Sequence, residues 1–244
     1  MKRLTVIVTG ASSGIGEAVA RYFLAKGDNV VINSATAKKL EQVYHALGAG
    51  PNLAFAAGDV SKKKTGEQLL KVALEKFGSA DVLVNNAGIY ESKPFLDVDE
   101  AYLDRFLNTN FKGTFFTTQA ILPQMLKQRD GAIINIGSPN VDHALSGAPS
   151  TAPLSSKGAI HALTLQLAAE FGKDNIRVNT IAPGIIRTPM HGDKADTLAG
   201  QHLLNRVGES GEIAQMVYAV ATNSYVTGAI INVDGGIGAG HHLQ

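Results

Sequence analysis

A glycine-rich turn near the start of the chain has the composition of an anion-binding loop. It reads TGASSGIG over residues 9–16 and follows a short apolar run at residues 4–8. Glycine lets the backbone turn sharply and approach a ligand closely, and a helix that follows presents free N–H groups and the positive end of its dipole. Between a strand and a helix, such a loop predicts binding of a nucleotide pyrophosphate.

The elements that must position this loop can be predicted from the alternation of short apolar runs with longer amphipathic ones. We expect strands at residues 4–8, 29–33, 53–57, 82–85, 132–136, 177–181 and 230–233. Helices are expected at residues 15–26, 37–47, 62–77, 99–127, 155–171 and 212–221. Strands that are apolar throughout suit a parallel sheet with helices on both faces. The sequence therefore predicts an α/β fold, a doubly wound Rossmann-type sheet in a single domain over residues 1–244.

Four motifs in this order resemble the short-chain dehydrogenase/reductase family. They are TGASSGIG, NNAG at residues 85–88, PG at 183–184 with TPM at 188–190, and DGG at 234–236, so that the match covers nearly the whole chain. The resemblance implies a nicotinamide cofactor. Its pyrophosphate would lie at Gly10, Ser12, Ser13, Gly14, Ile15 and Gly16, its adenine at Asp59 and Val60, its adenosine ribose and the sheet edge at Asn86, Ala87 and Gly88, and its nicotinamide at Pro183, Gly184, Ile186 and Thr188.

The end of the second strand favours NADP(H) over NAD(H). An acidic residue about 20 positions past the glycine turn would bond the ribose 2′-hydroxyl of NAD and repel the 2′-phosphate of NADP. Residues 31–36 read VINSAT and contain no carboxylate. Ser34 is followed by Lys38 and Lys39, whose hydroxyl and charges suit a phosphate. Against this preference, Ser13 stands where many NADP-preferring relatives carry a basic side chain.

The resemblance also implies four catalytic side chains, one of which is missing. Asn110, Ser138 and Lys157 match the family's asparagine, serine and lysine. In the family the asparagine holds a water near the lysine, and the serine orients the substrate carbonyl. The lysine binds the nicotinamide ribose and lowers the pKa of a tyrosine four residues before it. That position is Pro153, so the chain resembles an atypical member of the family.

Because proline has no titratable group, another group would have to move the proton. Ser138 and Lys157 lie 19 positions apart, which indicates a small insertion, and no tyrosine occurs between them. His143 is the residue of that loop that titrates near neutrality, so we consider it as a substitute acid. Tyr90 and His191 follow motifs at the expected substrate end and are candidate substrate contacts. The histidines show no metal-ligand spacing, and no metal is predicted.

Three functions remain open at this stage. The first is an NADP(H)-dependent oxidoreductase that acts on a carbonyl/alcohol pair with an incomplete catalytic set. The second is a catalytically weak or inactive NADP(H)-binding protein, either a sensor or a partner subunit. The third is a lyase or isomerase that uses the same pocket.

The composition and charge of the chain indicate which kinds of partner to expect. The chain has 244 residues, a net charge of +1 and no cysteine, and its cations are spread along it. This pattern predicts a cytoplasmic protein with a small-molecule substrate and no nucleic-acid or membrane partner. The helix expected at residues 155–171 is apolar around more than one face. It therefore predicts burial against another copy, in a homotetramer or homodimer.

Overall fold

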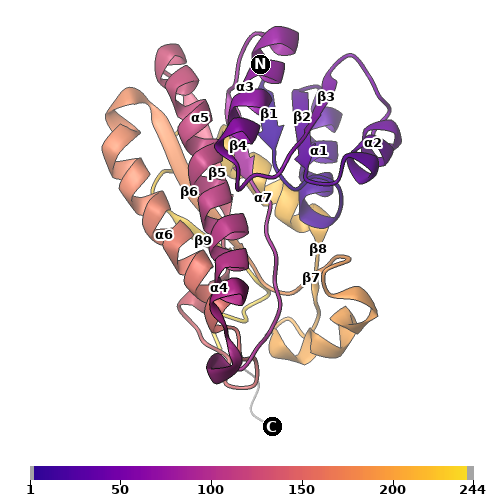
Figure 1. The fold of residues 1–244 in the computed structure, drawn as a ribbon, viewed down its shortest axis with the longest axis vertical. Helices are drawn as coiled ribbons and strands as arrows, with labels where there is room; N and C mark the ends of the chain where they lie inside the picture. The colour runs from indigo at the N-terminus through magenta and orange to yellow at the C-terminus, as the bar shows by residue number, and fades with distance from the viewer. Residues whose placement is uncertain (1–2, 241–244) are drawn as a thin grey trace.

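A seven-stranded parallel sheet forms the centre of the computed structural model, which describes residues 3–240 (Figure 1). Each neighbouring pair in this sheet is parallel. Its strands stand in the order β3 (Leu53–Ala57), β2 (Asn29–Ser34), β1 (Thr5–Val8), β4 (Val82–Asn85), β5 (Gly131–Ile136), β6 (Ile176–Pro183) and β9 (Ile230–Val233). The predicted Rossmann-type sheet is thereby confirmed.

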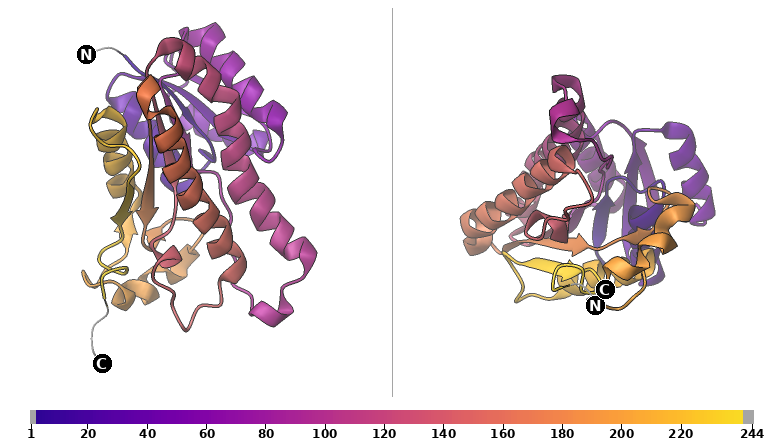
Figure 2. Two further views of the ribbon diagram at one scale, coloured as in Figure 1. Left: turned by 90° about the vertical axis from the view of Figure 1, so that its left-hand side faces the viewer. Right: turned by 90° about the horizontal axis from the view of Figure 1, so that it is seen from below.

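Helices cover both faces of this sheet, because successive strand residues point to opposite sides. Val6 and Val8 of β1 belong to the apolar core under α1 (Gly14–Ala25), α2 (Ala37–Ala46) and α7 (Ser210–Thr222). Ile7 between them belongs to a second core under α3 (Lys63–Phe77), α5 (Gly113–Gln128) and α6 (Thr151–Phe171). Figure 2 shows α7 on one side of the sheet and α5 and α6 on the other.

The strand order reverses next to β1. Strands β2 and β3 extend to one side of it, whereas β4 returns to the other side. The loops that leave the carboxyl ends of β1 and β4 therefore diverge and leave a crevice, which is where open α/β sheets bind ligands. Thr9 holds the two loops together, since its Oγ1 accepts the backbone N–H groups of Asn86 at 3.0 Å and Ala87 at 3.1 Å.

Two helices differ from the sequence prediction. The helix expected at residues 99–127 is divided into α4 (Glu100–Phe106), a π-helical turn (Leu107–Lys112) and α5. Helix α6 begins at Thr151, four residues before the predicted start, so that Pro153 lies in its first turn. A proline is tolerated there because the N–H groups of a first helical turn have no partner within the helix.

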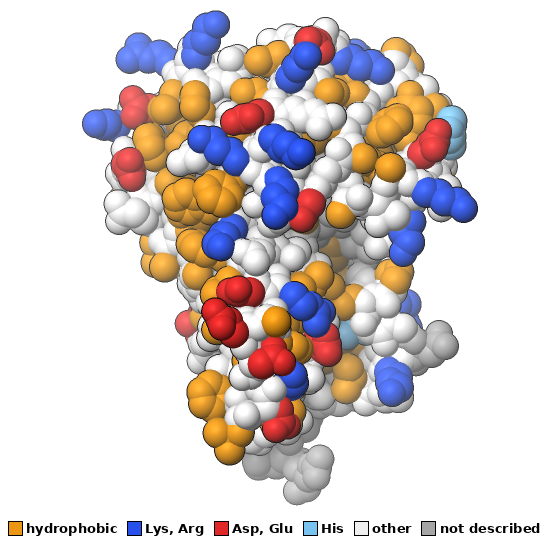
Figure 3. Space-filling view, viewed as in Figure 1, with side chains coloured by type: hydrophobic (Ala, Val, Ile, Leu, Met, Phe, Trp, Pro, Cys, Tyr) orange, Lys and Arg blue, Asp and Glu red, His pale blue; other side chains and the backbone are white. Residues whose placement is uncertain are grey.

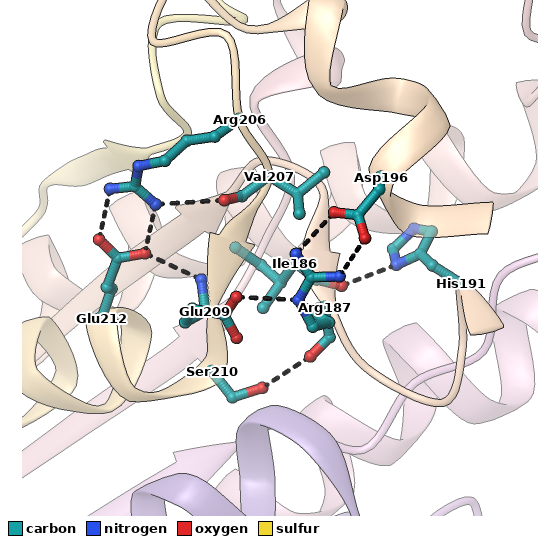
Figure 4. Close-up of polar contacts among 9 residues, drawn as sticks. All are labelled: Ile186, Arg187, His191, Asp196, Arg206, Val207, Glu209, Ser210 and Glu212. Atoms are coloured by element: carbon teal, nitrogen blue, oxygen red, sulfur yellow. Dashed lines mark hydrogen bonds and ion pairs between the residues drawn. The ribbon is translucent and has the colours of Figure 1, made fainter. Parts of the chain in front are cut away.

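A short cover segment that the sequence did not predict lies after β6. Strands β7 (Ile186–Arg187) and β8 (Gly208–Glu209) pair in parallel and flank a 3-10 helix at Gly192–Gln201. Arg187 joins these parts, with nitrogens 2.6 Å from Asp196 and 2.9 Å from Glu209 (Figure 4). Two-residue strands are too short to show a sequence period, which explains why they were missed.

Candidate functional site

An elongated cavity of about 880 Å³ opens at the carboxyl ends of the strands. Its wall combines the glycine-rich loop, the loops after β2, β4, β5 and β6, the start of α6 and the cover segment. Every predicted cofactor residue except Gly16 and the two lysines Lys38 and Lys39 lies in this wall. In Figure 3 the surface is hollowed between α4 and the cover segment, where the cavity meets solvent.

The glycine-rich loop has no room for side chains at two of its glycines. Gly10 has φ +64°, and a Cβ there would lie 2.7 Å from the Cα of Ala87. A Cβ at Gly16 would overlap the carbonyl oxygen of Gly10, so Gly16 allows α1 to pack against the loop rather than lining the cavity. Ser13 precedes α1 and makes no capping hydrogen bond with its side chain. The first N–H groups of α1 are thus left for an anion, and the cradle fits a pyrophosphate.

Hydroxyl groups line the cavity where β2 ends. Ser34 Oγ donates to Ser12 Oγ at 3.0 Å, and both residues lie in the wall. Asp59, after β3, contributes the one carboxylate among the lining residues that the structure describes. Lys38 and Lys39 are exposed and lie outside the wall. Because Ser34 donates its proton to Ser12, the end of β2 offers the neutral Ser12 hydroxyl as a donor to a ribose, without the two lysine ammonium groups that the sequence suggested.

Lys157 and Ser138 lie at the other end of the cavity. The Lys157 Nζ donates to the carbonyl oxygen of Ile136 at 2.6 Å, and it forms no ion pair with a carboxylate of the described chain. Burial without a counter-charge lowers the pKa of Lys157 to about 8. Ser138 Oγ accepts the backbone N–H of Asn140 at 3.3 Å and keeps its own hydroxyl proton for a ligand.

Asn110 does not line the cavity, but it connects two of the segments that form this end of the wall. It is fully buried in the π-helical turn, an arrangement often found at functional sites. Its Oδ1 accepts the N–H of Ile89 at 2.8 Å, and its Nδ2 donates to Ser156 Oγ at 2.9 Å. The side chain that the resemblance associates with a water is thus bonded to the protein. It links the loop after β4 to α6.

Gly88 allows that link to lie close to Lys157. A Cβ at Gly88 would lie 3.3 Å from Asn110 Oδ1 and 3.5 Å from Lys157 Nζ. These distances show that the loop after β4 passes directly beside the ammonium group.

Pro153 lies in the cavity wall. It stands four residues before Lys157 on α6, so both side chains project from one helix face. Its carbonyl oxygen accepts the Ser156 hydroxyl at 2.6 Å. The position that the resemblance assigns to a tyrosine therefore faces the cavity, but it carries an apolar ring.

The candidate substitute acid and the two candidate substrate contacts occupy different places. His143 is exposed, lies beside Gly238 and does not line the cavity. Tyr90 lines it, with its phenol oxygen 2.7 Å from Ser150 Oγ. His191 also lines it, and its Nδ1 lies 3.0 Å from the carbonyl oxygen of Ile186 (Figure 4). The structure thus brings Tyr90 and His191 into the wall with Ser138 and Lys157, and leaves His143 outside.

Several wall residues were not singled out from the sequence. Ser150 is buried at the start of α6 and bonds Tyr90, and Asn140 follows Ser138. The wall also contains apolar side chains, among them Leu145, Leu154, Ile185, Leu198 and Ile237. These residues are scattered along the chain without a motif, so only tertiary contacts identify them.

The described side chains within residues 3–240 include no cluster of three potential metal ligands, and none of the described helices is long and apolar enough to cross a membrane.

Comparison with known proteins identifies the family. The family described as short chain dehydrogenase matches residues 4–199. The 3-oxoacyl-[acyl-carrier-protein] reductase FabG of Staphylococcus epidermidis is 37% identical over 241 residues, covering 96% of this chain and 98% of that protein. The (2S)-[(R)-hydroxy(phenyl)methyl]succinyl-CoA dehydrogenase subunit BbsD of Thauera aromatica is 35% identical, covering 94% of each. The solved structure "ElxO with NADP Bound" superposes with a TM-score of 0.90 at 31% identity, covering 97% of this chain and 99% of that one.

The chain therefore belongs to the short-chain dehydrogenase/reductase family of oxidoreductases, whose members bind a nicotinamide cofactor.

Proposed function

We propose that this protein is an NADP(H)-dependent oxidoreductase that interconverts a carbonyl compound and its alcohol without a tyrosine before the lysine. The observation that carries the proposal is one continuous cavity wall, with the glycine cradle at one end and Ser138 and Lys157 at the other. A bound nicotinamide supplies or accepts the hydride there. Gly10, Gly14 and the first N–H groups of α1 hold the pyrophosphate, and Ser138 donates to the substrate oxygen.

The preference for NADP(H) is supported by the hydroxyl-lined end of β2. The Ser12 hydroxyl, which accepts a hydrogen bond from Ser34, presents a donor to a ribose, and no carboxylate lines the cavity at the end of β2. A 2′-phosphate is accepted by such a surface, whereas the 2′-hydroxyl of NAD finds no acidic acceptor. Calorimetric titration with NADPH and NADH tests this, and we expect tighter NADPH binding. The matched variant Ser34→Asp should reverse the preference, and equal affinities for both cofactors in the wild-type protein would contradict it.

The substrate class that we propose to test first is a 3-oxoacyl thioester. The FabG and BbsD relatives are named for acyl carrier protein and CoA derivatives, and the apolar side chains of the cavity wall, such as Leu145 and Leu198, suit an acyl chain. The test is NADPH oxidation with short 3-oxoacyl thioesters, beside simple ketones and quinones of equal size. Turnover with the thioesters alone would support a 3-oxoacyl thioester as the substrate. Turnover limited to other carbonyl compounds would show that the substrate belongs to another class.

Pro153 favours one alternative, an NADP(H)-binding protein with little or no turnover. Loss of a positioned general acid lowers rates by about 10²–10⁴-fold. NADPH binding without oxidation across the whole substrate panel would establish this alternative and exclude the oxidoreductase.

We also propose assembly as a homotetramer or homodimer through α5 and α6. Phe115 on α5 is 37% exposed and Leu165 on α6 is 52% exposed. Hydrophobic side chains gather over these helices on the face drawn in Figure 3. Exposed apolar residues in such a patch commonly mark an interface. Sedimentation should show an oligomer at micromolar concentration that Leu165→Glu dissociates, with Gln166→Glu as the matched control on the same helix.

A further inference from the structure

The cavity wall contains few groups that can release a proton. Among the described lining residues, Asp59, Tyr90, Lys157 and His191 are titratable. Asp59 follows β3 at the adenine side of the cradle. The Tyr90 phenol is already bonded to two hydroxyls, those of Ser92 and Ser150. His191 belongs to the cover segment and bonds a backbone carbonyl. Lys157 is the remaining member of this set, and it lies at the same end as Ser138.

The Lys157 ammonium has unused donors in the cavity. An ammonium group has three N–H bonds, and within residues 3–240 that of Lys157 makes one hydrogen bond, to the Ile136 carbonyl. Ile136 is two residues before Ser138, so this bond places Nζ beside the loop that carries the serine hydroxyl. Pro153, one turn earlier on the same helix face, offers no polar atom from its side chain. The resemblance assigns one of the two remaining N–H groups to the nicotinamide ribose, which leaves the other available to a substrate oxygen.

We propose that Lys157 is itself the proton donor of carbonyl reduction and, in the reverse direction, the proton acceptor. In reduction the carbonyl carbon gains the hydride, two electrons, from the reduced nicotinamide, and the carbonyl π pair moves to the oxygen. That oxygen takes a proton from Lys157 Nζ, which becomes a neutral amine and is reprotonated from solvent through the open end of the cavity. The products are the alcohol and the oxidised cofactor.

Burial supports this role, because it lowers the pKa of Lys157 to about 8. An ordinary lysine, with a pKa of 10.5, is a poor proton donor at neutral pH. A group that titrates close to the working pH is protonated and can still release its proton readily. This inference rests on the proposed oxidoreductase function and assigns the group that completes it.

The test compares Lys157→Arg with Lys157→Met. Arginine keeps the positive charge and the donors but does not release a proton in proteins. Lys157→Arg should therefore lose about 10²-fold or more in kcat with NADPH affinity near that of the wild-type protein, whereas Lys157→Met should also bind NADPH more weakly. Tyr90→Phe and His191→Gln remove the competing groups, and each should lose less kcat than Lys157→Arg. Lys173→Arg, at an exposed lysine outside the cavity wall, is the matched control and should keep kcat within about threefold, far less than loss of a general acid.

A second readout needs no turnover. In protein labelled with ¹³C and ¹⁵N in its lysines, the Lys157 side-chain signal, assigned by its loss in Lys157→Arg, should titrate near pH 8. The wild-type kcat for reduction should fall above the same pH. The double variant Pro153→Tyr/Lys157→Arg should recover at least tenfold over Lys157→Arg, because the phenol supplies a new proton donor next to the retained charge.

The outcomes separate this inference from the function on which it rests. Full turnover in Lys157→Arg, a Lys157 signal that titrates above pH 10, or a large loss confined to Tyr90→Phe would overturn the role of Lys157 and leave the oxidoreductase standing. A wild-type protein that binds NADPH but reduces no carbonyl of the panel overturns the proposed function and the proton-donor role together.

Discussion

The two ends of the cavity differ in the kind of group that faces a ligand. At the pyrophosphate end the ligand-facing groups are backbone N–H groups and glycines, and neighbouring backbone leaves no room for side chains at Gly10 and Gly16. At the Lys157 end the chemistry depends on single side chains held by a few hydrogen bonds. A site made of backbone groups is disrupted when a glycine gains a side chain. A site made of side chains can lose one of them while the others keep their positions. This difference explains how Pro153 can stand among otherwise matching residues.

The largest effect is expected for Gly14→Val in the cradle. Gly14 has φ +56°, and a Cβ there would lie 3.0 Å from the γ-methyl of Thr188. We expect NADPH affinity to fall by at least about 10²-fold, since a branched side chain would be strained and would narrow the cavity. Calorimetry measures the loss. Gly27→Val is the matched control, because Gly27 has φ +85° with open space around it. It should lower the melting temperature but keep binding, and equal loss of binding in both variants would contradict the cradle.

At the other end, Ser138→Ala should reduce kcat by about 10²-fold with NADPH affinity unchanged. The hydroxyl is a donor aimed at developing charge on the substrate oxygen, and loss of one such donor has an effect of this size. Steady-state kinetics with the best substrate of the panel measures it. Ser155→Ala, an exposed serine on α6, is the control and should behave like the wild-type protein. Unchanged kcat in Ser138→Ala would remove the serine from the mechanism.

Lys157 should make the protein less stable at neutral pH. Its pKa is lowered to about 8 in the folded chain from an ordinary value of 10.5. Between these values the unfolded chain binds more protons, so stability rises with pH through this window, and below pH 8 the whole penalty of the buried charge is present. Lys157→Met should therefore stabilise the protein at pH 7 by about 1–3 kcal/mol. This gain should shrink as the pH approaches 10.5. Urea denaturation at several pH values measures it, and a gain that grows with pH would contradict the buried charge.

The smallest effect is expected for His143→Ala. His143 is exposed and lies outside the cavity wall, so its removal should change kcat by less than about twofold, far below the loss expected for a general acid. The same kinetic assay, with a pH profile between 5 and 8, checks this. A loss of about 10²-fold would restore the histidine as the substitute acid and imply a different arrangement of the loop after Ser138.

Much of the fold could be predicted because it depends on local patterns. Apolar runs marked each strand of the main sheet, and the glycine turn was assigned to the junction of β1 and α1. The start of α6 was misplaced because Pro153 was interpreted as a loop residue, although the first turn of a helix accepts proline. The break in the long helix at Asn110 was missed because a π-helical turn has no local sequence signal and depends on what Asn110 bonds across the fold.

By itself, the sequence determined the Rossmann-type sheet, the cradle and the presence of Ser138, Lys157 and Pro153, since each depends on residue type and spacing along the chain. Only the tertiary structure decided which side chains share the cavity. Tyr90 and His191 enter it, and His143 does not, because distant loops converge at the carboxyl ends of the strands. The tertiary structure also decided the pKa of Lys157. Burial lowers this pKa through all the groups that surround the ammonium, and those groups are far apart in the sequence.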